Sequence, residues 1–346
     1  MEEEPPVLHQ APPLDTAWLR HEEEANLLAQ KPAMEPTVRQ QVYAAQCRER
    51  NNAMIAPGAR DHHLAQGIET KTTHVPSTLD GYATPLLQYA LSTEDGSPCP
   101  WIIIYYHGGG LVVGEADSED LSCRRIIKDS EAFLPGLRLY SVGYRLQPQH
   151  PATTIVQDCV DAFDFVVRRY PHAKILVVGS SSGGQLAALV TQRASKTSFQ
   201  GVVLRCPVTS DAFSGTEYVP EDIRDQHTSA WDRSFDTSLL GVMKREVPRD
   251  GLERMPLEVG EDALKGMPRT WIQVCTNDVL YSDGACYATI LRNAGVEVRI
   301  DVILGWPHTF WLKAPHLQRA FEADQAMIEG LAWIAGTTGL PSRTSS

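Results

Sequence analysis

The chain has 346 residues, of which 42% are hydrophobic and 21% charged, so a large core can form and global disorder is excluded. Its formal net charge of -12 at pH 7 argues against nucleic acid or an anionic membrane as a partner. The seven cysteines form no C-x-x-C pair, no apolar run is long enough to span a bilayer, and the acidic start Met1–Glu4 lacks an apolar signal segment. We therefore expect reduced thiols and a cytoplasmic location.

The first part of the chain predicts helices and no strands. Residues 1–15 are acidic and rich in proline, so we expect little order at the start. From Asp15 to about Asn52, apolar residues recur at spacings of three and four, interrupted by Pro32 and Pro36. Helices that precede every strand would have to lie on top of structure formed later, and a cap over a site is one such place.

Strands and helices then alternate along the chain. The predicted strands are residues 70–75, 84–91, 101–106, 137–144, 175–178, 201–206, 270–275 and 296–304. Predicted helices pass through Ile126 and Ile127 and cover residues 153–170, 185–189, 284–293 and 317–335. This alternation predicts an α/β protein with a mainly parallel sheet and helices on both faces.

One long segment, residues 207–268, shows no strand pattern. Its apolar residues have the spacing of one face of a helix: Trp231, Phe235, Leu239, Val242 and Met243. We interpret it as a second piece of the cap. The predicted organisation is N-terminal cap helices (1–65), core (66–206), second cap segment (207–268) and core again (269–346).

The stretch Gly179–Gly183 reads G-S-S-S-G and follows a buried strand, as in the G-x-S-x-G nucleophile elbow. A strand and a helix pass so close to such a turn that the positions two before and two after the nucleophile must be glycine. Ser181 alone meets that condition. A simple tight turn or a phosphate loop is the alternative, but no Gly-Lys-Ser/Thr follows and the middle glycine of G-x-G-x-x-G is missing.

A serine nucleophile needs a base and a group that orients the base. His308 follows the last predicted strand and Asp278 follows the one before, so both belong at the carboxyl edge of the sheet, where chemistry sits. Asp283 is the alternative carboxylate, but its place at a helix start favours a dipole interaction. Bare N–H groups at Gly108–Gly110 and the N–H of Ser182 suit the oxyanion of a tetrahedral intermediate.

With these motifs the chain resembles the hormone-sensitive-lipase-like serine esterases of the α/β-hydrolase superfamily. His107–Gly110 matches the family's H-G-G-G. Gly179–Gly184 matches G-D-S-A-G-G, with Ser180 in place of aspartate and Ser182 in place of alanine. Two further stretches are similar to Y-R-L-A-P-E-H-P and D-P-L: residues 144–151 and 278–280.

The resemblance implies an α/β-hydrolase fold with a mostly parallel eight-stranded sheet, a helical cap, and neither a cofactor nor a metal. It implies a catalytic triad and an oxyanion hole, which are Ser181, Asp278 and His308, and Gly108, Gly109 and Ser182. Family members often pair through the last strand, so a homodimer is an expectation.

The leading hypothesis is a serine carboxylesterase that hydrolyses an apolar small-molecule ester through an acyl-Ser181 intermediate. A weaker similarity to hydrolases of fungal secondary-metabolite pathways implies a polyketide-like ester, thioester or lactone. An acyltransferase, thioesterase or lactonase with the same triad is therefore an alternative. Two alternatives of another class are a non-catalytic ligand-binding protein and a non-covalent cyclisation catalyst.

Overall fold

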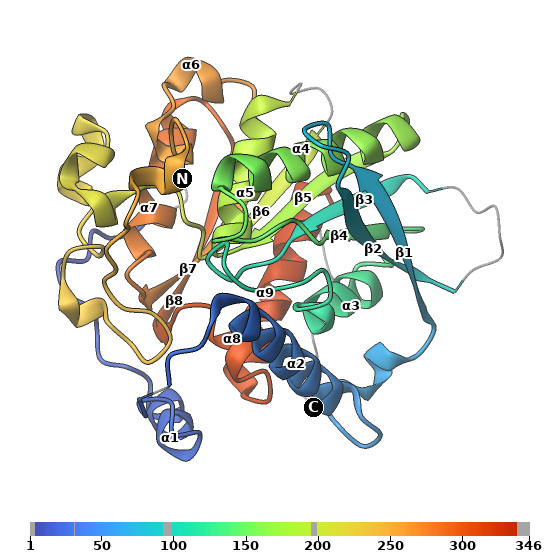
Figure 1. Ribbon diagram of the computed structural model, residues 1–346, viewed down its shortest axis with the longest axis horizontal. Coiled ribbons are helices and arrows are strands. Elements are labelled where there is room, and N and C mark those ends of the chain that lie inside the picture. Colours follow the sequence, from blue (N-terminus) through green and yellow to red (C-terminus); the bar gives the residue numbers. More distant parts are fainter. Residues whose placement is uncertain (1–3, 31, 93–98, 195–198, 338–346) are drawn as a thin grey trace.

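The structure is a computed structural model, and it describes residues 4–30, 32–92, 99–194 and 199–337. Within these residues the chain forms one sheet with the strand order β1-β2-β4-β3-β5-β6-β7-β8 (Figure 1). The strands are β1 (Ile68–Pro76), β2 (Ala83–Leu91), β3 (Trp101–Tyr106), β4 (Arg138–Val142), β5 (Lys174–Ser180), β6 (Phe199–Arg205), β7 (Arg269–Asn277) and β8 (Val298–Pro307). β2 pairs antiparallel with β1 and β4, and all other pairs are parallel. The predicted mostly parallel eight-stranded sheet is confirmed.

The centre of the sheet is β3, which pairs with β4 on one side and β5 on the other. All six of its residues are buried, because helices cover both faces of a parallel sheet. β1 lies at an edge of the sheet, and most of its side chains are exposed. The central, covered position of β3 accounts for its unbroken apolar sequence, and the edge position of β1 accounts for its mixture of polar and apolar residues.

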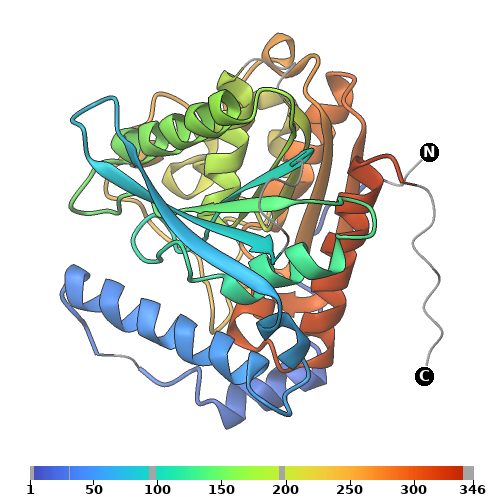
Figure 2. The same cartoon turned by 90° about the vertical axis from the view of Figure 1, so that its right-hand side faces the viewer.

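Two helical layers enclose the sheet, and Figure 2 shows them on its opposite sides. One layer contains α4 (Ala152–Arg169), α5 (Ser182–Arg193) and α7 (Tyr281–Asn293). The other contains α3 (Asp120–Asp129) and α9 (Gln318–Ile334), while α8 (Phe310–Lys313) follows β8. Among the described helices, none has both the length and the apolar character that crossing a bilayer requires.

The N-terminal segment lies across the carboxyl ends of β7 and β8. The side chains of Tyr281 and Asn277 each donate to a backbone carbonyl of this segment at 2.6 Å, and the amide of Asp15 donates to the carbonyl of Gly305 at 2.8 Å. The expectation of little order is therefore wrong for residues 4–15, because specific hydrogen bonds hold a segment without regular structure. Residues 1–3 lie outside the described part.

Two helices follow, α1 (Thr16–Glu24) and α2 (Pro36–Ile55), and then the short η1 (His62–Ala65). The fully buried Trp18 of α1 packs against Trp306, at the end of β8. From α2, Gln40 donates to the carbonyl of Val112 at 3.2 Å. The first helices therefore contact the end of β8 and the loop that follows β3, and their role as a cap stays a prediction.

The helix predicted over residues 231–243 is wrong. Asp232 accepts the amide of Ser234 at 2.7 Å and Asp236 accepts the amide of Val242 at 2.5 Å, so side chains take amides that a helix would use. Phe235 is fully buried, but Val242 is 39% exposed, so no single apolar face forms. The longer segment, residues 207–268, instead contains η3 (Ala212–Ser214), η4 (Thr216–Tyr218), η5 (Glu221–Gln226), η6 (Arg233–Phe235), η7 (Pro248–Gly251), η8 (Pro256–Glu258) and α6 (Glu261–Leu264).

Candidate active site

Ser181 stands alone between the end of β5 and the start of α5, with φ 53° and ψ -123°. Positive φ is rare for residues other than glycine and marks local strain. A Cβ on Gly179 would lie 2.2 Å from the carbonyl oxygen of Gly183, and one on Gly183 would lie 2.0 Å from that of Tyr106. No side chain fits at either position, which is the close approach that the spacing of the glycines predicts.

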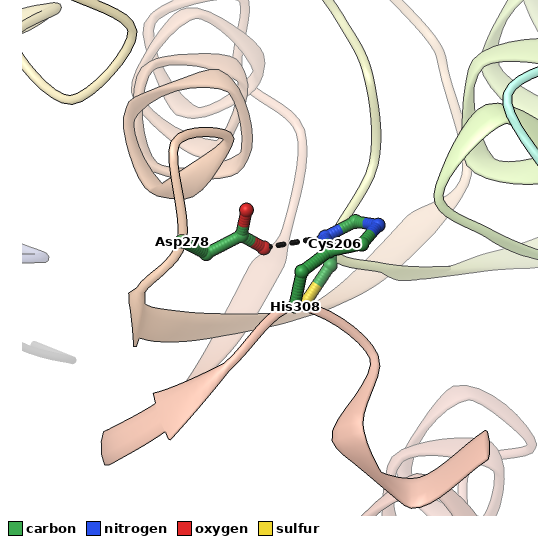
Figure 3. A group of neighbouring side chains, drawn as sticks. All are labelled: Cys206, Asp278 and His308. Atoms are coloured by element: carbon green, nitrogen blue, oxygen red, sulfur yellow. Dashed lines mark hydrogen bonds and ion pairs between the residues drawn. The ribbon is translucent and has the colours of Figure 1, made fainter. Parts of the chain in front are cut away.

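The structure brings Ser181, His308 and Asp278 together in a row. The imidazole Nε2 of His308 lies 2.8 Å from the hydroxyl oxygen of Ser181, and its Nδ1 lies 2.6 Å from Oδ2 of Asp278. Figure 3 shows the carboxylate meeting the imidazole ring. The other carboxylate oxygen accepts the amide of Leu280 at 2.9 Å, which fixes the orientation of the aspartate.

The surroundings of His308 change its basicity. Asp278 is 1% exposed and His308 is 7% exposed. Burial alone would lower the pKa of His308, but the charge of Asp278 and the hydrogen bond to it raise the pKa above its ordinary value. The imidazole is thus a stronger base than free histidine, and the hydroxyl of the half-buried Ser181 is the group it faces.

A cysteine that the sequence analysis did not single out lies beside this row. The thiol of Cys206, Nδ1 or Nε2 of His308 and an oxygen of Asp278 are all within 4.8 Å of one another (Figure 3). Cysteine, histidine and aspartate are the side chains that zinc prefers. Here, however, Nδ1 and Oδ2 already share one hydrogen bond, so a cation would have to displace the proton between them. The arrangement therefore fits proton transfer better than metal binding.

The glycine loop after β3 lies against the elbow. The amide of Gly108 donates to Oε1 of Glu119 at 2.6 Å, so it is not directed at the hydroxyl of Ser181 and does not fit the oxyanion role predicted for it. The amides of Gly109 and Gly110 have no acceptor among the described residues. Ser182 is the first residue of α5, and an amide at that position has no acceptor within a helix.

Glu119 is a second residue that the sequence analysis missed. It is 4% exposed, and its carboxylate accepts hydrogen bonds from Gly108, Ser180 and Tyr105. Burial raises the pKa of this carboxyl above its ordinary value, although the three hydrogen bonds act in the opposite direction. The signal in the sequence was Ser180, where the family motif has a carboxylate.

A family model described as the alpha/beta hydrolase fold matches residues 103–312. The chain belongs to the α/β-hydrolase fold family.

The similar curated proteins include several named as esterases or ester hydrolases. Ethyl acetate hydrolase of Pseudomonas putida is 29% identical over 296 residues, which are 82% of this chain and 87% of that protein. Versiconal hemiacetal acetate esterase stcI of Emericella nidulans is 29% identical over 292 residues, 76% of this chain and 98% of that protein. FAD-linked oxidoreductase pytB of Aspergillus terreus is 30% identical over 256 residues, which are 70% of this chain but 30% of that protein.

The similar solved structures agree on the fold. Vibralactone cyclase has a TM-score of 0.77 at 19% identity, over 96% of this chain and 97% of that one. An esterase of Pyrobaculum calidifontis has a TM-score of 0.66 at 25% identity, over 94% of this chain and 99% of that one. These findings confirm the predicted fold and family, and they support the predicted enzyme class.

Proposed function

We propose that the protein is a serine carboxylesterase that hydrolyses a small-molecule ester through an acyl-Ser181 intermediate. The observation that carries the proposal is the hydrogen-bonded row of Ser181, His308 and Asp278, with distances of 2.8 Å and 2.6 Å, at the carboxyl ends of β5, β7 and β8. The relatives named as ester hydrolases support it independently. The row also argues against a purely ligand-binding role, which would need neither a strained serine nor an oriented base.

In the first half-reaction, Nε2 of His308 takes the proton of Ser181 while the serine oxygen attacks the ester carbonyl carbon. The resulting oxyanion accepts hydrogen bonds from the amides of Gly109, Gly110 and Ser182. Asp278 stabilises the imidazolium, which then protonates the alcohol as the ester C–O bond breaks. Water repeats the same steps on the acyl-enzyme, releases the carboxylic acid and restores the serine.

The substrate is proposed to be an apolar ester, in keeping with the fungal relative named as a versiconal hemiacetal acetate esterase. Thioester or lactone hydrolysis and acyl transfer would use the same groups and remain alternatives. The likeness to vibralactone cyclase shows the fold and carries no argument for cyclisation. The cytoplasmic location and the homodimer stay predictions.

A fluorophosphonate probe tests the proposal, because it phosphonylates an activated serine. We expect one labelled peptide, which contains Ser181, and turnover of p-nitrophenyl esters. Ser181→Ala should lose the label, and kcat should fall by about 10⁶-fold, as in other triad enzymes. Ser210→Ala, at a buried serine that also contacts a histidine, is the matched control and should keep both. The proposal would be wrong if folded wild-type protein is not labelled and hydrolyses none of the p-nitrophenyl esters with acyl chains of about C2 to C12.

A further inference from the structure

The place of Glu119 in the chain does not explain its conformation. It precedes the first residue of α3 and so occupies the N-cap position, where a side chain ordinarily accepts amides of the first helical turn. Glu119 makes no such hydrogen bond. Its carboxylate instead lies inside the protein, away from the helix it begins. Burying a carboxylate costs free energy unless hydrogen bonds satisfy it. The groups that donate to Glu119 therefore explain why its carboxylate is stable inside the protein.

Three donors from three parts of the fold meet on this carboxylate. Oε1 accepts the amide of Gly108 and the hydroxyl of Ser180, both at 2.6 Å. Oε2 accepts the hydroxyl of Tyr105, on β3, at 2.5 Å. Gly108 begins the glycine loop and Ser180 ends β5, so a single oxygen atom joins the two segments.

These two segments carry the proposed machinery. Gly108 precedes Gly109 and Gly110, and Ser180 precedes Ser181. The segments already touch, since a Cβ on Gly108 would lie 3.1 Å from the carbonyl oxygen of Ser180 and 3.2 Å from Cβ of Ser181. Any change in their separation would therefore move the amides of the loop relative to the nucleophile.

The substitution in the family motif fits the same picture. The motif G-D-S-A-G-G has an aspartate at the position of Ser180, within the elbow itself. Here the elbow supplies a hydroxyl, and a carboxylate from the start of α3 reaches it. The carboxylate is thus present behind the nucleophile but is attached to a different element.

We propose that Glu119 is a positioning residue, which holds the glycine loop at the distance from Ser181 that oxyanion stabilisation requires. It acts through Gly108 and Ser180 and touches no reacting atom. This inference rests on the proposed esterase function. Because the oxyanion forms only in the transition state, the loss of Glu119 lowers kcat and leaves KM nearly unchanged.

Two substitutions at residue 119 separate the acceptor role from the charge. Glu119→Leu removes both acceptor oxygens, and kcat should fall by about 10²-fold, the effect of a misplacement near 1 Å. Glu119→Gln keeps one oxygen that can accept from Gly108 and Ser180, so kcat should stay within about 5-fold of the wild-type value. KM for p-nitrophenyl butyrate should stay within about 3-fold in both, since ground-state binding is not involved.

Asp161→Leu is the matched control. Asp161 is also 4% exposed and also accepts a backbone amide and a hydroxyl, both from Thr78, but it lies on α4 and contacts none of the site residues. Both Leu variants should lose thermal stability, whereas only Glu119→Leu should lose kcat per site that the fluorophosphonate labels. Wild-type kcat per labelled site in Glu119→Leu, or a raised KM with unchanged kcat, would overturn the inference.

If Glu119→Leu does not fold, Ser180→Ala tests the positioning role of Glu119 instead. It removes one of the three hydrogen bonds without leaving a buried charge unpaired, and we expect kcat to fall by about 5-fold at constant KM. An unchanged kcat there would reject the positioning role. Failure of the esterase proposal looks different, because wild-type protein itself would then show no labelling and no turnover.

Discussion

Within the part of the chain that the structure describes, a serine, a histidine and an aspartate meet at two places, around Ser181 and around Ser210. In the first cluster both imidazole nitrogens of His308 are used, one facing the serine hydroxyl and the other facing Asp278. A proton can therefore leave the serine on one side of the ring while the carboxylate stabilises the positive charge from the other side. The serine is half-buried and lies at a strained turn.

In the second cluster all contacts converge on one side of the ring. Nε2 of His227 lies 3.2 Å from the hydroxyl of Ser210 and 3.1 Å from Oδ1 of Asp283. The hydroxyl of Ser210 itself donates to that same Oδ1. Nδ1 of His227 has no partner among the described residues. The carboxylate competes with the histidine for the serine proton, so no relay forms.

The difference shows that residue types alone do not make a triad; the order of contacts and the access to the hydroxyl do. Ser210, His227 and Asp283 are each at most 1% exposed, so no ester could reach them. They join the segment after β6 to α7, near the site but outside it. We infer that the first cluster serves chemistry and the second holds the fold.

Replacing each histidine by alanine should give the largest difference in kcat between the two clusters. His308→Ala should lower kcat by about 10⁶-fold, because the serine loses its base. His227→Ala should keep kcat per labelled site but lower the free energy of unfolding by about 2 kcal/mol, since buried hydrogen bonds are lost. Steady-state kinetics with active-site labelling and thermal denaturation measure both. A large loss of kcat in folded His227→Ala would contradict the assignment.

Replacing each aspartate by asparagine should give a smaller difference in kcat between the two clusters, together with a difference in pH dependence. Asp278→Asn should lower kcat by about 10⁴-fold, because the amide no longer holds the imidazole in the required tautomer. Asp283→Asn should leave kcat per labelled site within about 3-fold of the wild-type value, because it contacts no reacting group.

The sign of the pH effect follows from His308. The imidazole must be neutral to take the serine proton, so activity falls as the pH drops through its pKa. Asp278 raises that pKa, and Asp278→Asn removes the cause, so the acidic limb of the kcat/KM profile should move to lower pH. Asp283→Asn should not move it. An acidic limb that stays in place in Asp278→Asn would mean that another group controls the profile.

Parts of the site could be predicted from the sequence because local rules determine them. The apolar run Trp101–Tyr106 can only be a covered strand, and it is one. Gly179 and Gly183 mark Ser181 because a Cβ at either position would collide with backbone. Ser181, Asp278 and His308 each follow a predicted strand, so all three could be placed at the carboxyl edge of a parallel sheet.

Other parts depend on tertiary contacts that no local pattern records. Glu119 reaches Ser180 across 61 positions of sequence, and nothing near Glu119 in the chain indicates that its side chain points inward. Apolar spacing predicts a helix after Trp231, but Asp232 and Asp236 capture backbone amides instead. The role predicted for Gly108 depended on where its N–H points, which only the position of Glu119 decides.

The smallest contrast concerns stability, and it should have opposite signs at the two serines. Ser181 has φ 53°, a conformation that costs a residue with a side chain about 1–3 kcal/mol and costs glycine little. Ser181→Gly should therefore abolish activity. It should raise the free energy of unfolding by about 1 kcal/mol, because the relieved strain exceeds the lost hydrogen bond to His308 and the added flexibility of the unfolded chain. Ser210→Gly should keep activity but lower that free energy by about 2 kcal/mol, because it removes buried hydrogen bonds and adds flexibility to the unfolded chain. Urea unfolding of both variants beside the wild type measures the two shifts. If Ser181→Gly is destabilised as much as Ser210→Gly, the backbone conformation of Ser181 does not cost the folded protein free energy, and the elbow is not strained.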